Sequence, residues 1–221
     1  MIYITGDMHG DPSRLDAAGR KLKKDDVLLV CGDFGFLWEG GENEKKRLKK
    51  LEKKKFTIAF IDGVHENYDL LLKYPEEEWK GGKVHRLGKN IFHLERGEIF
   101  TLEGDTFFAF GGGENEEKPL YQDSGHWWEE EMPSLEEMEK GASRLKENGM
   151  QVDYILTHTP APGMGLQNRA RGEEAAQLYS FFTAIAKQVE YKKWFFGCIH
   201  LDRKITARHY ALFEEILPLG D

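Results

Sequence analysis

The sequence predicts an α/β fold built as a single domain over residues 1–221. Three apolar runs, at residues 1–5, 27–31 and 56–61, are each followed by a segment with helical spacing. Continuous apolar runs rich in β-branched side chains are typical of strands buried on both faces of a parallel sheet. Each run ends at a glycine close to an aspartate or a histidine. Functional sites of open α/β sheets lie at the carboxyl ends of the strands, so we expect the site there.

The composition favours a globular protein without a membrane span. The 221 residues carry a net charge of −8, and the chain has no apolar run of about 18 or more residues. The N-terminus lacks a basic region and a cleavage site, so we expect no signal peptide. Two cysteines do not make a disulfide framework, which favours a reducing, cytoplasmic setting. The negative charge disfavours duplex DNA as a partner, because binding requires lysines and arginines that neutralise phosphates.

The remaining elements follow in order along the chain. Asp11-Pro12-Ser13 begins a helix that extends to Lys24, and residues 42–55 form a second, very polar helix. We interpret this second helix as solvent-exposed rather than as a nucleic-acid patch, because it has no aromatic residue for base stacking. Further elements are expected as a helix at 67–73, strands at 83–87, 91–95, 98–102, 106–110, 152–157 and 194–196, a capped helix at 134–148, a helix at 173–189 and a closing pair of strands within 204–217.

A long polar segment at residues 114–133 interrupts this regular pattern. It contains Tyr121, His126, Trp127 and Trp128 among many glutamates. A loop of this length inside a compact domain is often a lid or a binding loop. The alternative is that the two tryptophans simply pack the loop against the rest of the protein.

Aspartates and histidines recur where the predicted strands end. Taken alone, Asp7-Met8-His9 is also compatible with an aspartate helix cap beside an incidental histidine. Taken together, the strand-end groups predict a metal site, because parallel strands bring their ends to one edge and such ligands suit Zn, Mn or Fe. The groups are Asp7, His9, Asp33, His65, His158 and His200, with Cys198 beside the last of them.

Five short motifs stand in order between residues 4 and 205: Asp7-Met8-His9, Gly32-Asp33, Gly63-Val64-His65-Glu66, Thr157-His158 and Gly197-Cys198-Ile199-His200. Their order and spacing resemble those of the calcineurin-like metallophosphoesterases. The nearest resemblance is to the small bacterial or phage-type phosphoesterases. It implies two packed mixed β-sheets flanked by helices, a four-layer αββα sandwich, with the site at the strand ends.

The resemblance assigns metal ligands to the strand-end residues. It implies that Asp7, His9 and His200 hold a first metal ion. Asp33 then bridges this ion to a second one, and His158 belongs to the second ion. The family is expected to use Mn, Zn or Fe as its divalent metal.

The resemblance also implies a catalytic pair. The sequence departs from the family pattern at two positions. His65 is expected to act beside the metals as the proton donor or charge stabiliser for the leaving oxygen, with Glu66 orienting it. Val64 stands where the family has an asparagine ligand, and Cys198 stands where it has a histidine, both of which serve the second metal. Valine cannot coordinate a metal, whereas Cys198 is either a thiolate ligand or a buried apolar filler. We therefore expect one firmly bound ion and a second that is weak or absent.

The implied function is metal-dependent hydrolysis of a phosphodiester or phosphomonoester, with a metal-bound hydroxide as the nucleophile. The asymmetric centre leads us to expect low activity. The expected substrate is a small phosphoester, with a nucleotide as one candidate. The residues expected to contact it are Arg169, Arg171, His126 and Trp128.

Two other functions are compatible with the sequence. The first is a catalytically weak or inactive member of the same fold that serves as a binding protein, which the loss of two ligands favours. The second is an interaction protein that uses the acidic loop at 114–131. The retained His65, Glu66 and complete first metal site favour the enzyme. The sequence does not indicate an oligomeric state.

Overall fold

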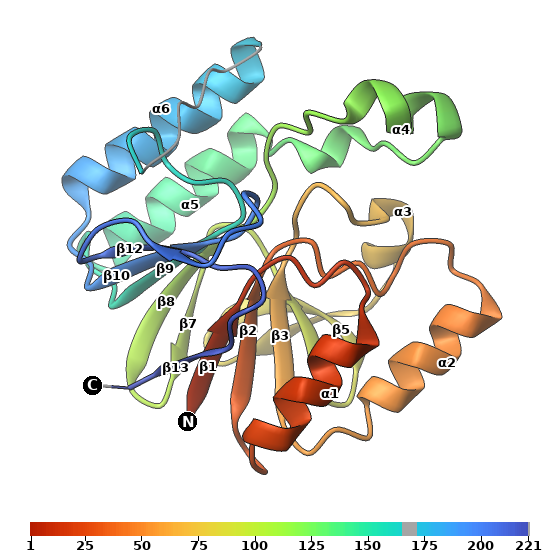
Figure 1. Ribbon diagram of the computed structural model, residues 1–221. Coiled ribbons are helices and arrows are strands. Elements are labelled where there is room, and N and C mark those ends of the chain that lie inside the picture. The colour runs from red at the N-terminus through yellow and green to blue at the C-terminus, as the bar shows by residue number, and fades with distance from the viewer. Residues whose placement is uncertain (165–171, 221) are drawn as a thin grey trace.

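The computed structural model describes residues 1–164 and 172–220 and contains two β-sheets packed face to face, with helices on both outer sides (Figure 1). The first sheet has seven strands in the order β13-β1-β2-β3-β6-β5-β4. The second has six strands in the order β11-β12-β10-β9-β8-β7. Both sheets combine parallel and antiparallel pairs, which confirms the predicted α/β fold with two mixed sheets.

The parallel core of the first sheet is formed by the three apolar runs identified in the sequence. Strands β1, β2 and β3 lie in register as parallel neighbours, and β6 joins them in parallel. The strands of this sheet are β1 (Ile2–Thr5), β2 (Val27–Cys31), β3 (Thr57–Ile61), β4 (Glu76–Trp79), β5 (Gly82–Gly88), β6 (Ile91–Leu94) and β13 (Leu217–Leu219).

The second sheet is built around four parallel strands, with β7 and β11 antiparallel at its two edges. Its inner strands are mostly apolar, as expected for strands covered on both faces. The strands are β7 (Glu98–Leu102), β8 (Asp105–Phe110), β9 (Tyr154–Thr157), β10 (Lys193–Phe196), β11 (Arg203–Lys204) and β12 (His209–Ala211).

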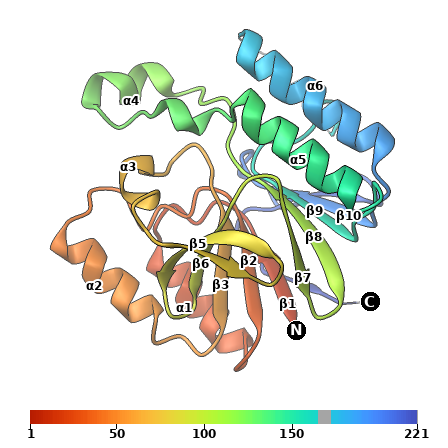
Figure 2. The same cartoon turned by 180° about the vertical axis from the view of Figure 1, so that it is seen from behind.

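Helices complete the outer layers (Figures 1 and 2). Helices α1 and α2 pack on the outer face of the first sheet, and α5 and α6 pack on that of the second. Helix α5 begins at the predicted capping box, in which Ser134 and Glu137 bond to each other's backbone N–H groups. The helices are α1 (Pro12–Lys21), α2 (Glu42–Leu51), α3 (Tyr68–Leu71), α4 (Lys118–Ser124), the 3-10 helix η1 (Glu129–Glu131), α5 (Leu135–Glu147) and α6 (Glu173–Gln188).

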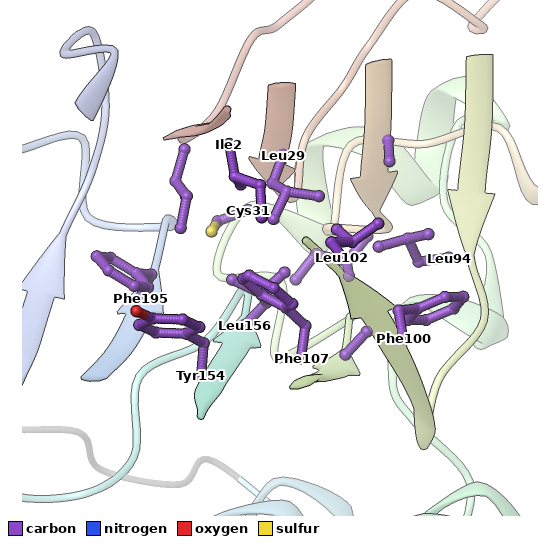
Figure 3. Close-up of a cluster of buried hydrophobic side chains, with 14 of the residues drawn as sticks. Ile2, Leu29, Cys31, Leu94, Phe100, Leu102, Phe107, Tyr154, Leu156 and Phe195 are labelled. Atoms are coloured by element: carbon purple, nitrogen blue, oxygen red, sulfur yellow. The ribbon is translucent and has the colours of Figure 1, made fainter. Parts of the chain in front are cut away.

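The principal core lies between the two sheets (Figure 3). Ile2 and Leu29 of the first sheet belong to the same buried cluster as Phe107, Leu156 and Phe195 of the second. Removal of these side chains from water supplies the main driving force that holds the sheets together. The packed sheets fix the relative positions of their strand ends, which carry the expected site.

Several segments differ from the sequence expectation: α1 ends at Lys21 instead of Lys24, and β4 was not predicted. Helix α2 ends at Leu51 instead of Lys55, because no apolar side chain follows Leu51 to pack on the sheet before the chain turns. The segment at 114–133 contains α4 and η1. The closing pair of strands consists of three short strands, β11, β12 and β13. Within the described ranges no helix is long and apolar enough to span a membrane.

Candidate metal centre

The strand-end loops reverse direction very sharply. Five residues without the freedom of glycine have a positive φ at these loops: Asp7 (31°), His9 (47°), Asp33 (47°), Cys198 (67°) and His200 (50°). This backbone conformation is strained for L-residues and is concentrated at functional sites. Five of the nine described non-glycine residues with a positive φ thus lie in the loops after β1, β2 and β10, which carry the aspartates and histidines of the cluster.

Two glycines allow these loops to pack closely. A Cβ atom on Gly63 would lie 2.0 Å from Oδ1 of Asp33, and one on Gly32 would lie 2.2 Å from Nδ1 of His158. Any larger residue at either position would displace a polar side chain of the cluster. Both positions therefore require glycine because there is no room for a Cβ atom, whatever the conformation of the turn.

The deepest part of the cluster joins Asp7, Asp33 and His158. All three side chains are almost completely buried. His158 has Nδ1 3.4 Å from Oδ1 of Asp7 and Nε2 3.6 Å from Oδ1 of Asp33. Oδ2 of Asp7 and Nε2 of His158 have no hydrogen-bond partner. Burying a polar atom without a hydrogen-bond partner costs free energy. Because no described group of the protein satisfies either atom, both are suited to bind a ligand.

The outer part of the cluster brings histidines from opposite ends of the chain together. Nε2 of His9 lies 2.9 Å from Nε2 of His200 and 3.9 Å from Oδ2 of Asp33. Among the described residues, potential ligand atoms lie within 4.8 Å of one another in two groups, Asp7–Asp33–His200 and His9–Asp33–His65. Both groups contain Asp33, so its carboxylate is common to the two sets of potential ligand atoms.

The charges of the cluster also fit a cation. Burial raises the pKa of Asp7 to about 7, even though nearby His158 lowers it. Burial acts to lower the pKa of His158, but Asp33 and Cys198 outweigh it and raise that pKa well above its usual value. Protons thus compensate the negative charge of the cluster, and a divalent metal would displace them. Carboxylate and imidazole ligands suit Zn, Mn and Fe, so the residues present fit such an ion.

Asp33 is held in place by the loop after β3. Its Oδ1 accepts hydrogen bonds from the backbone N–H groups of Val64 and His65, at 2.8 and 2.9 Å. Its Oδ2 lies 2.8 Å from Nδ1 of His65. Burial acts to raise the pKa of Asp33, but His158 and His65 hold it well below its usual value. The ionised carboxylate is therefore both oriented and ready to bind a cation.

Glu66 has partners that differ from those implied by the family resemblance. Its carboxylate accepts hydrogen bonds from the backbone N–H groups of Phe34 (2.6 Å) and Gly35 (3.3 Å). Neither of these hydrogen bonds reaches the His65 ring, whose nitrogens lie against Asp33 and Glu117. The side chain is 1% exposed. Glu66 thus fixes the loop that carries Asp33, and it acts on the site through that loop.

The sequence matches one known family over most of its length. A family model described as calcineurin-like phosphoesterase matches residues 1–202. The chain belongs to the calcineurin-like phosphoesterase family. This confirms the resemblance found in the sequence, and the family depends on divalent metals. No curated protein matches the chain.

Among solved structures, the chain is similar to a candidate 5′-nucleotidase from Staphylococcus aureus, crystallised with α-ketoglutarate. The two chains are 11% identical, and their TM-score is 0.46. The match covers 96% of this chain and 48% of the other, so the protein spans about half the length of that nucleotidase.

The two departures from the family pattern lie side by side with the retained ligands. Val64 is buried, with 7% of its surface exposed, and has no atom that can bind a metal. Cys198 is partly exposed and lies close enough to His158 to help raise its pKa. Its backbone N–H donates to Oδ1 of Asp7, at 3.0 Å. Cys198 therefore lies beside the buried part of the cluster.

Only two of the four residues expected to contact substrate lie in the described part of the chain. Arg169 and Arg171 lie outside the described residues. His126 and Trp128 belong to an aromatic cluster with Trp38, whose ring stacks on His126 at 5.3 Å between centroids and meets Trp128 edge-on at 5.7 Å.

Two residues close to His65 were not predicted from the sequence. Trp38 has its ring centroid 6.5 Å from that of His65, and Glu117 has Oε2 3.1 Å from Nε2 of His65. Trp38 follows Asp33 by five positions and was detectable by its closeness to a motif. Glu117 is one of many glutamates in its segment, and no sequence pattern distinguishes it.

Proposed function

We propose that this protein is a metal-dependent hydrolase of phosphodiesters or phosphomonoesters. The observation that carries the proposal is the pair of buried, unpartnered atoms on Asp7 and His158 within a convergent cluster of aspartates and histidines. Family membership supports the same chemistry. A nucleotide or another small phosphoester is the substrate that we propose.

In this proposal the first metal ion is held by Asp7, His9, Asp33 and His200. When bound, the divalent metals polarise the phosphoryl group and lower the pKa of water toward neutrality. The buried walls around Asp7 and Asp33 keep bulk water away from these carboxylates, which strengthens their attraction for a cation.

His65 supplies the proton for the leaving oxygen. Its Nδ1 is held by Asp33, and its Nε2, which lies 3.1 Å from Oε2 of Glu117, is the atom that we propose faces the substrate. Burial lowers the pKa of His65, but its hydrogen bonds to Asp33 and Glu117 outweigh burial and raise it. The imidazole is therefore favoured in the protonated state that general acid catalysis requires.

The second metal position is weaker than the first in this proposal. Asp33 and His158 remain as ligands, and Cys198 is the third candidate because it lies close enough to His158 to help raise its pKa. A thiolate ligand favours Zn or Fe over Mn. With Val64 in place of an amide ligand, we propose one firmly bound ion, a second weakly bound ion and low activity.

The altered second position also favours a second candidate function, a binding protein with little or no catalysis. The two candidates differ in what they require of His65. A binding protein has no need of an imidazole that is hydrogen-bonded to Asp33 and placed beside the metal ligands.

The test is hydrolysis of bis(p-nitrophenyl) phosphate and p-nitrophenyl phosphate by protein supplied with Mn²⁺, Zn²⁺ or Fe²⁺. We expect turnover of at least one ester, and a large loss of that turnover in His65→Ala. His209→Gln is the matched control, because His209 lies on β12 and bonds to Tyr191 instead of the cluster. Absence of turnover with every metal would contradict the enzyme and leave the binding protein.

A further inference from the structure

Helix α4 brings a carboxylate to the catalytic histidine. Glu117 immediately precedes α4, and its Oε2 lies 3.1 Å from Nε2 of His65. In Figure 1, α4 lies beyond α3 at the end of the molecule toward which β1, β2 and β3 run. Under the proposed function, Nε2 of His65 protonates the leaving oxygen. The group that departs from phosphorus must therefore lie next to Glu117.

Aromatic rings border the same position. The ring of Tyr121 meets that of His65 edge-on, with centroids 5.3 Å apart, and the ring of Trp38 lies 6.5 Å from His65. Tyr121 and Trp38 contact each other at 5.9 Å in a T-shaped pair. Both side chains are only half-buried, so part of each ring remains open to a ligand.

Hydrogen bonds to its backbone hold the loop that carries Trp38 in place. The carboxylate of Glu44 accepts hydrogen bonds from the backbone N–H groups of Trp38, Glu39 and Gly40. Asn67 donates a further hydrogen bond to the carbonyl oxygen of Trp38, at 2.6 Å. The loop that carries Trp38 is thus rigidly held, which reduces the entropy lost when a ligand stacks on it.

Other hydrogen bonds anchor residues 114–131, which carry Glu117 and Tyr121. Trp128 donates from Nε1 to Oδ2 of Asp69 (3.1 Å), and Asn115 donates to Oε2 of Glu131 (2.8 Å) and to the carbonyl oxygen of Val64 (3.3 Å). These bonds link residues 114–131 to the motif that contains His65. Glu117 and Tyr121 therefore hold a defined position beside it.

We propose that Glu117, Tyr121 and Trp38 form a leaving-group subsite that selects an uncharged aromatic leaving group, such as a nucleoside. This inference rests on the proposed function and names its substrate class. In the reaction, water adds to phosphorus, the bond between phosphorus and the leaving oxygen breaks, and the proton of His65 passes to that oxygen. A nucleoside stacks on the rings and offers O–H or N–H donors to Glu117.

The charge of Glu117 provides the discrimination. When the leaving group is itself a phosphate ester, its negative charge develops next to this carboxylate. Two like charges a few ångströms apart repel each other, even though the Glu117 side chain is exposed. A phosphoester of a nucleoside is consequently a better substrate than a nucleoside diphosphate, whose terminal phosphoryl group departs from an anionic nucleotide.

The experiment compares adenosine 5′-monophosphate with adenosine 5′-diphosphate, using metal-loaded full-length protein. Loss of the terminal phosphate from the diphosphate releases an anionic leaving group, whereas the monophosphate releases neutral adenosine. We expect Glu117→Gln to raise the diphosphate-to-monophosphate ratio of kcat/KM at least about tenfold. Asp123→Asn is the matched control, because it removes the same charge from an exposed side chain on the same helix. The control should leave the ratio unchanged.

A second comparison tests the rings with adenosine 5′-monophosphate and glycerol 2-phosphate, which has a neutral but non-aromatic leaving group. Tyr121→Ala should reduce the preference for the adenosine ester about tenfold or more. Tyr121→Phe should retain the preference, which separates loss of the ring from loss of the hydroxyl group.

Each arm has an outcome that overturns the inference. If Glu117→Gln changes the diphosphate-to-monophosphate ratio no more than Asp123→Asn does, the carboxylate does not select the leaving group. If Tyr121→Ala affects both esters equally, there is no aromatic subsite. Hydrolysis of these esters with unchanged ratios would sink this inference alone, whereas no hydrolysis of any ester with any metal would sink the proposed function.

Discussion

His9 and His200 are 191 positions apart in the chain, yet their Nε2 atoms lie 2.9 Å apart. His9 follows β1 of the first sheet, and His200 follows β10 of the second. The packing of the two sheets is therefore what closes the candidate metal centre. Two imidazole nitrogens that face each other at this distance share either a proton or, in our account, a metal ion.

Asp33→Asn tests the residue shared by both groups of ligand atoms. The change keeps the size of the side chain but removes its negative charge, so the affinity for a cation falls. We expect kcat/KM to drop by about 100-fold or more, as for loss of a group that stabilises the transition state. Steady-state hydrolysis of a chromogenic phosphoester measures this. Asp16→Asn, an exposed α1 residue, is the control, and a threefold or smaller effect of Asp33→Asn would exclude the role.

The double change Val64→Asn and Cys198→His tests whether these two residues limit the second metal position. An amide oxygen and an imidazole restore ligand types that transition metals accept. We expect the amount of bound metal to rise toward two ions per chain, measured by elemental analysis after gel filtration. The two single variants are the controls. If the double variant binds no more metal than the native protein, then Val64 and Cys198 do not limit the second site.

Glu66→Ala tests the support of the loop that carries Asp33. The change leaves the backbone N–H groups of Phe34 and Gly35 without their acceptor in a buried position. We expect the free energy of unfolding to fall by about 2–4 kcal/mol in urea denaturation. Glu66→Gln keeps an amide oxygen as acceptor and should recover part of the loss. Equal destabilisation by both changes would show that the hydrogen bonds are not the cause.

The pH dependence of stability should report a buried pair beside the centre. Burial raises the pKa of Asp62, but Arg96 and His93 outweigh burial and hold it well below its usual value. Ionised Asp62 therefore stabilises the fold above about pH 4, the ordinary range for an unfolded aspartate, and this contribution is lost as the pH falls toward the lower folded pKa.

Arg96→Met makes this prediction measurable. The variant leaves Asp62 buried without its main partner, so the free energy of unfolding should fall by about 3–5 kcal/mol at pH 7. The difference in free energy of unfolding between the variant and the native protein should become smaller at pH 3, because protonation of Asp62 then removes the buried charge from the variant. Urea denaturation at both pH values checks this. The same difference at pH 7 and pH 3 would show that Asp62 is not the group involved.

The strand-end motifs were predictable because each is local. Asp7 and His9, or Val64 and His65, lie within a few residues of an apolar run that identifies a strand, and parallel strands then determine a shared edge. Strand β4 was not predictable, because its residues Glu76–Trp79 are mostly charged and show no apolar alternation. Its place at the edge of the sheet comes from pairing with β5.

The surroundings of His65 were not predictable for a different reason. Its contact with Glu117 joins residues 52 positions apart and depends on how α4 folds back over the centre. The hydrogen bond from the backbone N–H of Cys198 to Asp7 likewise needs the packing of two loops. Such contacts depend on tertiary structure, whereas periodicity and motif spacing describe only what is close along the chain.

The number of metal ions that the native protein retains tests both the existence of the metal centre and its asymmetry. We would load the protein with Zn²⁺, pass it through gel filtration and count the ions per chain by elemental analysis, with His200→Ala as the comparison. Our account predicts close to one ion in the native protein and a clear loss in the variant. No retained metal would contradict the metal centre, and two equally retained ions would contradict its asymmetry.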